Sequence, residues 1–188
     1  MAKKESHQID STNKLTENID EKMKKSELHK FFISALKDIY YAEHALIDGL
    51  EKMQKSATTE ELQDAFEDHQ LQTKKHISRL EKVFTLLDEK ADKKECEAIK
   101  GLIKEAEEII KSTKDGSMTR DAALIIAAQK IEHYEIATYG GLVQLALTME
   151  HEKVADLLER TLSEEEETDD NLTEIAETAI KVEAEEEN

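Results

Sequence analysis

Four segments of the chain carry apolar residues at intervals of three and four, the spacing that places side chains on one face of an α-helix. One such stripe contains Ile125, Ala128, Leu142, Ala146 and Met149. The composition agrees with helices, because the 188 residues include no proline, five glycines and only 4% aromatic residues. Sheet proteins are richer in aromatic, β-branched and turn-forming residues. The sequence therefore predicts an all-α fold.

The positions of the stripes predict a four-helix bundle that occupies residues 26–182. A shorter amphipathic stretch separates the second and third long helices, and a separate helix at that place is typical of two hairpins joined by one long crossover. We expect a flexible polar arm at residues 1–25 and a frayed acidic tail at residues 183–188. The four long helices are expected at about residues 26–55, 58–87, 120–149 and 151–182.

Capping residues suggest where three of the helices begin. Ser26 is suited to cap the first helix, and Thr58 with Glu61 fits a capping box at the start of the second. Asp92 and Glu95 suggest a cap for the short crossover helix. These caps predict short, well-defined links between neighbouring helices.

The charge and cysteine content exclude several classes of partner. A formal net charge of −18 at pH 7 argues against nucleic acid, because phosphates would be repelled. Much of this charge is at the end, since residues 163–188 hold twelve acidic residues and one lysine. No apolar run approaches the roughly 20 residues that span a bilayer, the first residues do not resemble a signal peptide, and the single Cys96 has no internal disulfide partner. We expect a cytoplasmic protein that binds neither membrane nor nucleic acid.

Each long helix has polar residues near the middle of its apolar stripe. Helix midpoints meet at one height in an antiparallel bundle, so these residues should converge in the core. Gln72 lies one position from the stripe of the second helix. The interrupting residues are Glu43 in the first helix, His69, Thr73 and His76 in the second, Glu132 and Glu135 in the third, and Glu165 and Asp169 in the fourth.

Buried carboxylates repel one another and require protons or cations. No Lys or Arg occurs at this height on any stripe, and carboxylate with imidazole suits Fe, Mn or Zn. The ferritin-like arrangement supplies such ligands to two metal ions from four facing helices. Two explanations compete with this one: each Glu lies at the edge of its stripe with its head in water, or a solvated polar layer lies inside the bundle.

The remaining polar residues near these positions are assigned simpler roles. Cys96, flanked by acidic residues on an exposed-looking helix, is expected to be structural or incidental. His133 points away from the neighbouring glutamates but can orient a ligand. Tyr134 and Tyr139 are candidates for hydrogen bonding to a bound ligand or for supplying an electron. The expected surface residues are His29, His44, His151, Glu164, Glu166, Glu167 and Asp170.

Four segments resemble the signature helices of the YciE/YciF-type ferritin-like stress proteins of bacteria: LKDIYYAEHAL, FEDHQLQTKKHISRLEKVF, RDAALIIAAQKIEHYEIATYGGL and LLERTLSEEEETDDNLTEIA. The pair Glu132 and Glu135 is also similar to the third-helix motif of rubrerythrins. The resemblance implies a di-metal bundle, commonly a homodimer, that is tied to stress responses without an established reaction. It assigns the metal ligands to Glu43, His69, Glu132, Glu135, Glu165 and Asp169.

The sequence departs from the family pattern at one position. Gln72 stands where the family usually has Glu, and His76, where Gln is common, is expected to compensate. The four-cysteine iron domain of rubrerythrins has no counterpart here, so redox turnover would need an external electron donor.

Two functions follow from these expectations. The first is a di-metal stress protein, with Fe or Mn favoured over Zn, that oxidises Fe(II) or consumes peroxide or dioxygen. The second is a non-catalytic stress-associated bundle with a structural or vestigial metal site. A ferritin storage cage is less well supported than either, because neither the crossover helix nor the acidic tail suggests shell contacts.

Overall fold

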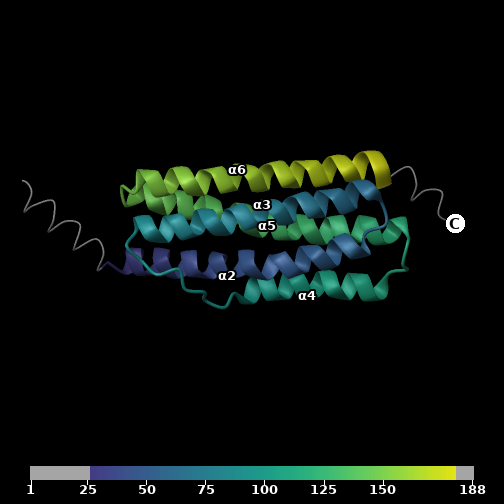
Figure 1. The fold of residues 1–188 in the computed structure, drawn as a ribbon, viewed down its shortest axis with the longest axis horizontal. Helices are drawn as coiled ribbons and strands as arrows, with labels where there is room; N and C mark the ends of the chain where they lie inside the picture. The colour runs from purple at the N-terminus through teal and green to yellow at the C-terminus, as the bar shows by residue number, and fades with distance from the viewer. Residues whose placement is uncertain (1–25, 181–188) are drawn as a thin grey trace, which may run out of the picture.

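The computed structural model describes residues 26–180, and this part of the chain is helical, with no strand (Figure 1). The expected arm at residues 1–25 and tail at residues 183–188 lie outside the described residues. The prediction of an all-α fold is confirmed. The elements are α2 (Glu27–Ser56), α3 (Glu60–Leu86), α4 (Glu97–Ser112), α5 (Met118–Thr148), α6 (Glu152–Ile175) and a π-helical turn, η1 (Ala176–Ile180).

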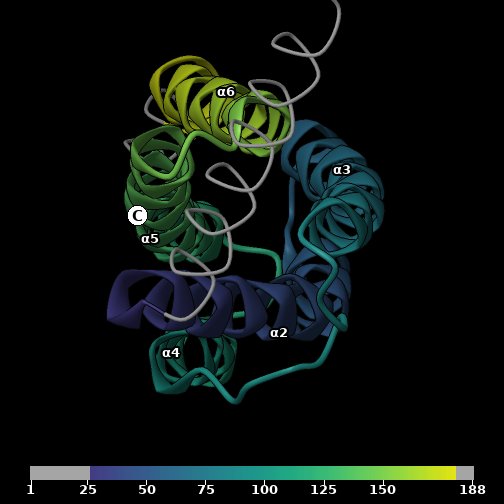
Figure 2. The same cartoon turned by 90° about the vertical axis from the view of Figure 1, so that its left-hand side faces the viewer.

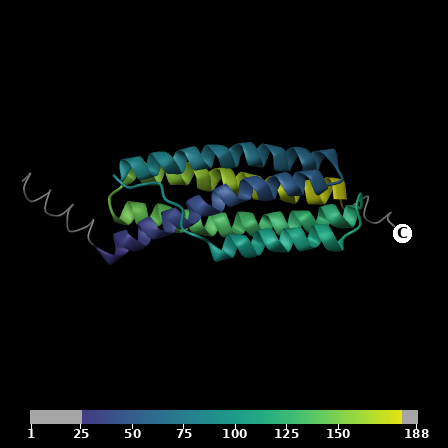
Figure 3. The same cartoon turned by 60° about the horizontal axis from the view of Figure 1, so that its bottom comes forward.

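The four long helices lie side by side around a common centre. Helices α2 and α3 form one antiparallel hairpin and α5 and α6 form another, and the end-on view shows the hairpins facing each other (Figure 2). Helix α4 lies outside this group, against α2 and α5 (Figure 3). Because α4 runs back along the molecule before α5 begins, α3 and α5 point in the same direction.

The helix starts agree with the sequence at Ser26 and differ at the second helix. The Ser26 side chain accepts a hydrogen bond from the His29 amide at 3.1 Å. The N-cap of α3 is Thr59 rather than Thr58, and its side chain makes no capping bond. Instead, the buried carboxylate of Asp121 in α5 accepts hydrogen bonds from the amides of Thr58 and Thr59 at 2.7 and 2.8 Å and from the Thr59 hydroxyl at 2.9 Å. A distant carboxylate thus replaces the predicted capping box.

The short helix α4 begins later than predicted. Its N-cap is Cys96, so the caps proposed at Asp92 and Glu95 are wrong. The preceding link is attached to α2 by a hydrogen bond from the Lys94 amide to the Lys37 carbonyl at 3.0 Å. The link therefore follows α2 for some distance before α4 begins.

The predicted stripes form the core, with one change in α6. Leu162 is only half-buried there, whereas Thr161 is 1% exposed. The inward positions of α6 are Leu158, Thr161 and Glu165, which still step by three and four. The hydroxyl of Thr161 therefore faces the core where the sequence predicts the side chain of Leu162.

Candidate metal centre

Two overlapping groups of buried side chains lie at the centre of the four long helices. The His69 group consists of His69, Glu132, Glu135 and Glu165, and the His76 group consists of Glu43, His76 and Glu165. Within each group, one ligand atom from every residue lies within 4.8 Å of the others. Glu165 belongs to both groups, so the two clusters share a carboxylate.

Helical spacing explains how these side chains come together. His69 and His76 are seven residues apart on α3, and Glu132 and Glu135 are three apart on α5, so each pair lies on one helix face. Glu43 projects from α2 and Glu165 from α6. All six side chains are 3% exposed or less, which excludes the expectation that they lie at stripe edges with their heads in water.

Several carboxylate oxygens in the cluster accept no hydrogen bond from the described residues. These atoms are Oε2 of Glu43 and Glu132 and both oxygens of Glu135 and Glu165. The Tyr139 hydroxyl donates to the other oxygen of Glu43. Buried oxygens without donors are costly, and the donor set of carboxylates and imidazoles is the one that Fe, Mn and Zn prefer. The residues present therefore fit divalent metal ions.

The pKa values of the cluster residues show the same cost of burying several carboxylates together. Burial and the charge of Glu165 raise the pKa of Glu132 and of Glu135 well above the usual value. Burial raises the pKa of Glu165 to about 7, although His76 opposes the shift. Burial also lowers the pKa of His69 to about 3. A cation in the cluster would favour the ionised carboxylates and the neutral imidazole.

His76 is the one cluster residue with charged partners on both sides of its ring. Its Nδ1 lies 3.0 Å from Glu165 and 3.6 Å from Glu43, and its Nε2 lies 2.8 Å from Glu164. Burial alone would lower the pKa of His76, but the carboxylates of Glu165 and Glu43 outweigh it and raise the pKa to about 10. In the absence of metal, a protonated His76 offsets part of the cluster's negative charge.

Glu164 contacts the cluster through His76 and is held by Arg79, although no sequence pattern selects either residue. Glu164 was expected on the surface, but it is only partly exposed, and Arg79 donates to both of its oxygens at 2.8 and 2.9 Å. Burial raises the pKa of Glu164, but the hydrogen bonds from Arg79 and His76 outweigh this effect and lower it. Helix α6 has acidic residues at every angle, so periodicity cannot distinguish Glu164 from its neighbours. Glu166, Glu167 and Asp170 are exposed, as predicted.

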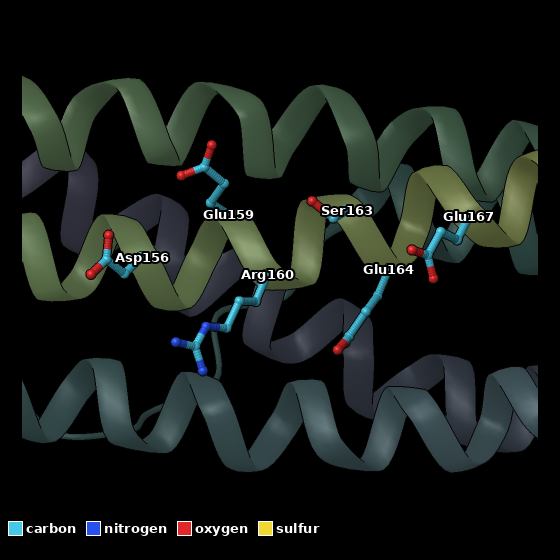
Figure 4. Close-up of a pocket in the computed structure, with 6 residues that line it drawn as sticks. All are labelled: Asp156, Glu159, Arg160, Ser163, Glu164 and Glu167. Carbon is cyan, nitrogen blue, oxygen red and sulfur yellow. The ribbon is translucent and has the colours of Figure 1, made fainter.

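Glu164 also lines an open pocket on the outer side of α6. The close-up shows Glu164 and Arg160 reaching toward α3, while Glu159 points toward α5 (Figure 4). Glu164 is thus accessible from this pocket and touches the buried His76. The full lining is Asp156, Glu159, Arg160, Ser163, Glu164 and Glu167.

Asp169 and Gln72 lie beside the two groups rather than within them. Asp169 Oδ2 is 3.2 Å from Nε2 of the exposed His133, and its buried Oδ1 accepts no hydrogen bond from the described residues. Gln72 is half-buried and accepts a weak hydrogen bond from the Thr168 hydroxyl at 3.4 Å. The His69 and His76 groups form without either side chain.

Two residues that the sequence places at the surface are buried. Cys96 is buried, and its Sγ lies 3.1 Å from the Tyr134 hydroxyl, because the N-cap position of α4 faces α5. His29 is also buried and packs edge-to-face near His151, with ring centroids 6.2 Å apart. Because acidic residues flank Cys96 on both sides, its burial could not be predicted from the sequence.

The fold and the cluster define an all-helical protein with buried histidine and glutamate groups that are able to hold a metal ion. Residues 27–185 match the family model described as Domain of unknown function (DUF892), and the chain belongs to this family, as its resemblance to YciE/YciF-type proteins predicted. It is 42% identical to Protein YciF of Escherichia coli over 164 residues, which are 87% of this chain and 98% of that protein.

Solved structures agree with this assignment. The crystal structure of the E. coli stress protein YciF matches with a TM-score of 0.78 and 40% identity, over 87% of this chain and 99% of that one. YcfI from Rhodopseudomonas palustris, described as a proposed structural protein, matches with a TM-score of 0.76 and 36% identity, over 79% and 94% of the two chains. Among the described residues, no helix has the length and apolar content needed to cross a membrane.

Proposed function

We propose that this chain is a cytoplasmic, ferritin-like di-metal protein of the stress response. One ion would be held by the His69 group and the other by the His76 group, with Glu165 shared between them. Iron or manganese is favoured, and zinc suits the same ligands. The observation that carries the proposal is the overlap of two buried ligand groups at a single carboxylate.

The proposed reaction is the oxidation of Fe(II) or the consumption of peroxide or dioxygen. Bound metal would supply the redox chemistry, while the protein fixes geometry and excludes water. Conversion of one peroxide molecule to two water molecules would consume two protons and two electrons, with two Fe(II) ions as the source of the electrons. Tyr139 holds one Glu43 oxygen by its hydrogen bond. A single cysteine cannot form a four-cysteine iron site, so repeated consumption of peroxide or dioxygen would require an external electron donor.

Metal uptake tests the proposal directly. The purified protein is loaded anaerobically with Fe(II) or Mn(II), and bound metal per chain is measured by elemental analysis after gel filtration. We expect two ions per chain. Glu165→Ala should lose most of both, because the substitution removes a ligand from each group.

Glu167→Ala is the matched control for this experiment. Glu167 lies on the same helix but is exposed, so its loss should leave the metal content unchanged. Trace metal in the wild-type protein after anaerobic loading would refute the proposal, whereas equal metal content in the two variants would refute the ligand assignment.

A non-catalytic bundle is the second candidate. His76 lies between Glu43, Glu164 and Glu165, and when protonated it offsets their negative charge without a metal ion. This arrangement favours the second candidate. The description of YcfI as a proposed structural protein agrees with it. Rapid oxidation of loaded Fe(II) by peroxide, lost in Glu132→Ala, would favour the catalytic function, and equal rates in both proteins would favour the bundle.

The same proposal includes a homodimer rather than a storage cage. A dimer of the 21.4 kDa chain has a mass of about 43 kDa, far below that of a multi-subunit shell. Sedimentation equilibrium distinguishes the two assemblies.

A further inference from the structure

His76 has a carboxylate of helix α6 close to each of its ring nitrogens. Its Nε2 lies 2.8 Å from Oε2 of Glu164, and its Nδ1 lies 3.0 Å from Oε1 of Glu165. The Glu43 carboxylate is also on the Nδ1 side, at 3.6 Å. The two sides of the ring therefore face different surroundings: Nδ1 faces the buried ligand group and Nε2 faces the edge of the bundle.

Glu164 is itself fixed in place by Arg79. The guanidinium donates from NH1 to Oε2 at 2.8 Å and from NH2 to Oε1 at 2.9 Å, so both carboxylate oxygens are engaged. NH1 also donates to the hydroxyl of Thr161, which is 1% exposed, at 2.6 Å. A two-pronged contact of this kind fixes the orientation of a carboxylate more strictly than a single bond does.

We propose that Glu164, clamped by Arg79, is a positioning residue that accepts the Nε2–H of His76 and so makes Nδ1 the metal-binding atom. This inference rests on the proposed function. A histidine that binds metal through one nitrogen commonly donates from the other to a carboxylate, which fixes both tautomer and ring orientation. Glu164 belongs to neither ligand group, so its role is exerted through His76.

Binding through Nε2 would conflict with the surrounding contacts. The metal would then lie beside Glu164, whose oxygens are engaged by Arg79, at the rim of the open pocket in Figure 4. Glu43 and Glu165, the other members of the His76 group, approach the opposite nitrogen. Only Nδ1 lets all three side chains bind the same ion.

Nuclear magnetic resonance of the histidine nitrogens tests this geometry. Zn(II) is the probe, because it is diamagnetic and suits the same ligands. In protein labelled with 15N-histidine, we expect Zn(II) to shift the Nδ1 signal of His76 to a metal-bound position, while Nε2 keeps a proton that exchanges slowly with water. His76→Gln assigns the signals.

Substitutions at Glu164 separate positioning from a purely structural role. Glu164→Ala should weaken Zn(II) binding about tenfold or more, the usual effect of losing such a partner, and should speed exchange of the Nε2 proton. Glu164→Gln keeps an accepting oxygen and should recover part of both effects. Glu167→Ala, on the same rim, should match the wild type. If Glu164→Ala does not fold, Arg79→Gln removes the clamp alone and should shift both measurements in the same direction.

The results distinguish failure of this inference from failure of the proposed function. Zn(II) bound through Nε2, or wild-type affinity together with unchanged proton exchange in Glu164→Ala, would overturn the inference while leaving a metal site. A loss of thermal stability in Glu164→Ala with unchanged His76 signals would show a structural role and would also overturn it. No uptake of Zn(II), Fe(II) or Mn(II) by the wild type would refute the metal site itself, and the inference with it.

Discussion

Glu165 shows how one residue can have conflicting requirements in a folded core. It is fully buried, its close contact with a positively charged group is to Nδ1 of His76 at 3.0 Å, and burial still raises its pKa to about 7. A leucine at this position would pack without these costs. Residues that are locally unfavourable for folding concentrate at functional sites. The adjacent Glu164 is a second example, because its carboxylate contacts the buried His76 as well as water.

Tyr139 gives a prediction for a single hydrogen bond. The buried hydroxyl donates to Glu43, so Tyr139→Phe leaves that oxygen without its donor. We expect the metal-free protein to lose about 1–3 kcal/mol of unfolding free energy. Urea denaturation followed by circular dichroism measures the loss.

Tyr41→Phe serves as the comparison. The Tyr41 hydroxyl makes no hydrogen bond to residues 26–180, and its removal should change stability by less than about 0.5 kcal/mol. Equal effects of the two substitutions would show that the bond from Tyr139 to Glu43 contributes little.

At the level of the helices, periodicity predicted the elements and which residues face inward. Glu43, Glu132 and Glu135 were identified because each occupies a position that its stripe requires to be buried. Periodicity gives the rotation of a residue around its own helix but not its partner on another helix. For that reason periodicity does not predict the contact between Arg79 and Glu164, or the contact between Asp169 and His133 on α5.

The helix starts show the same limit. A capping box depends on residues close in sequence, but the start of α3 depends on Asp121, 62 residues after Thr59. Asp121→Ala leaves two amides and a hydroxyl without their acceptor and should destabilise the protein by about 2 kcal/mol or more. Thermal and urea unfolding measure the change.

Asp68→Ala is a suitable control for the Asp121 substitution. Asp68 is exposed in the first half of α3, and its loss should change stability by less than about 0.5 kcal/mol. If Asp121→Ala were no more harmful than Asp68→Ala, water would be replacing the carboxylate at the start of α3.

For the molecule as a whole, the cluster links folding to pH. In the metal-free protein His76 has a pKa of about 10, above its ordinary 6.5, so its contribution is complete below pH 6.5 and is lost as pH rises toward 10. The pKa of Glu165 is raised to about 7, so its contribution to stability is complete below pH 4.5 and is lost as the pH rises to 7. The pKa of His69 is lowered to about 3, so its contribution to stability increases as the pH rises, but only below pH 6.5. Above pH 6.5, the contributions of His76 and Glu165 to stability therefore both decrease as the pH rises, and the contribution of His69 no longer changes.

We accordingly expect the unfolding free energy of the metal-free protein to fall steadily from pH 6.5 to pH 9.5. His76→Gln should be less stable at pH 6.5 and should show a flatter profile. Metal reverses the trend, because binding requires ionised carboxylates and neutral imidazoles and releases protons, so affinity for Mn(II) or Zn(II) should rise with pH across the same range. Urea unfolding in chelator measures the first effect, and calorimetric titration in buffers of different ionisation enthalpy measures the proton release. A metal-free protein whose stability rises between pH 6.5 and 9.5 would show that His76 is not protonated between Glu164 and Glu165.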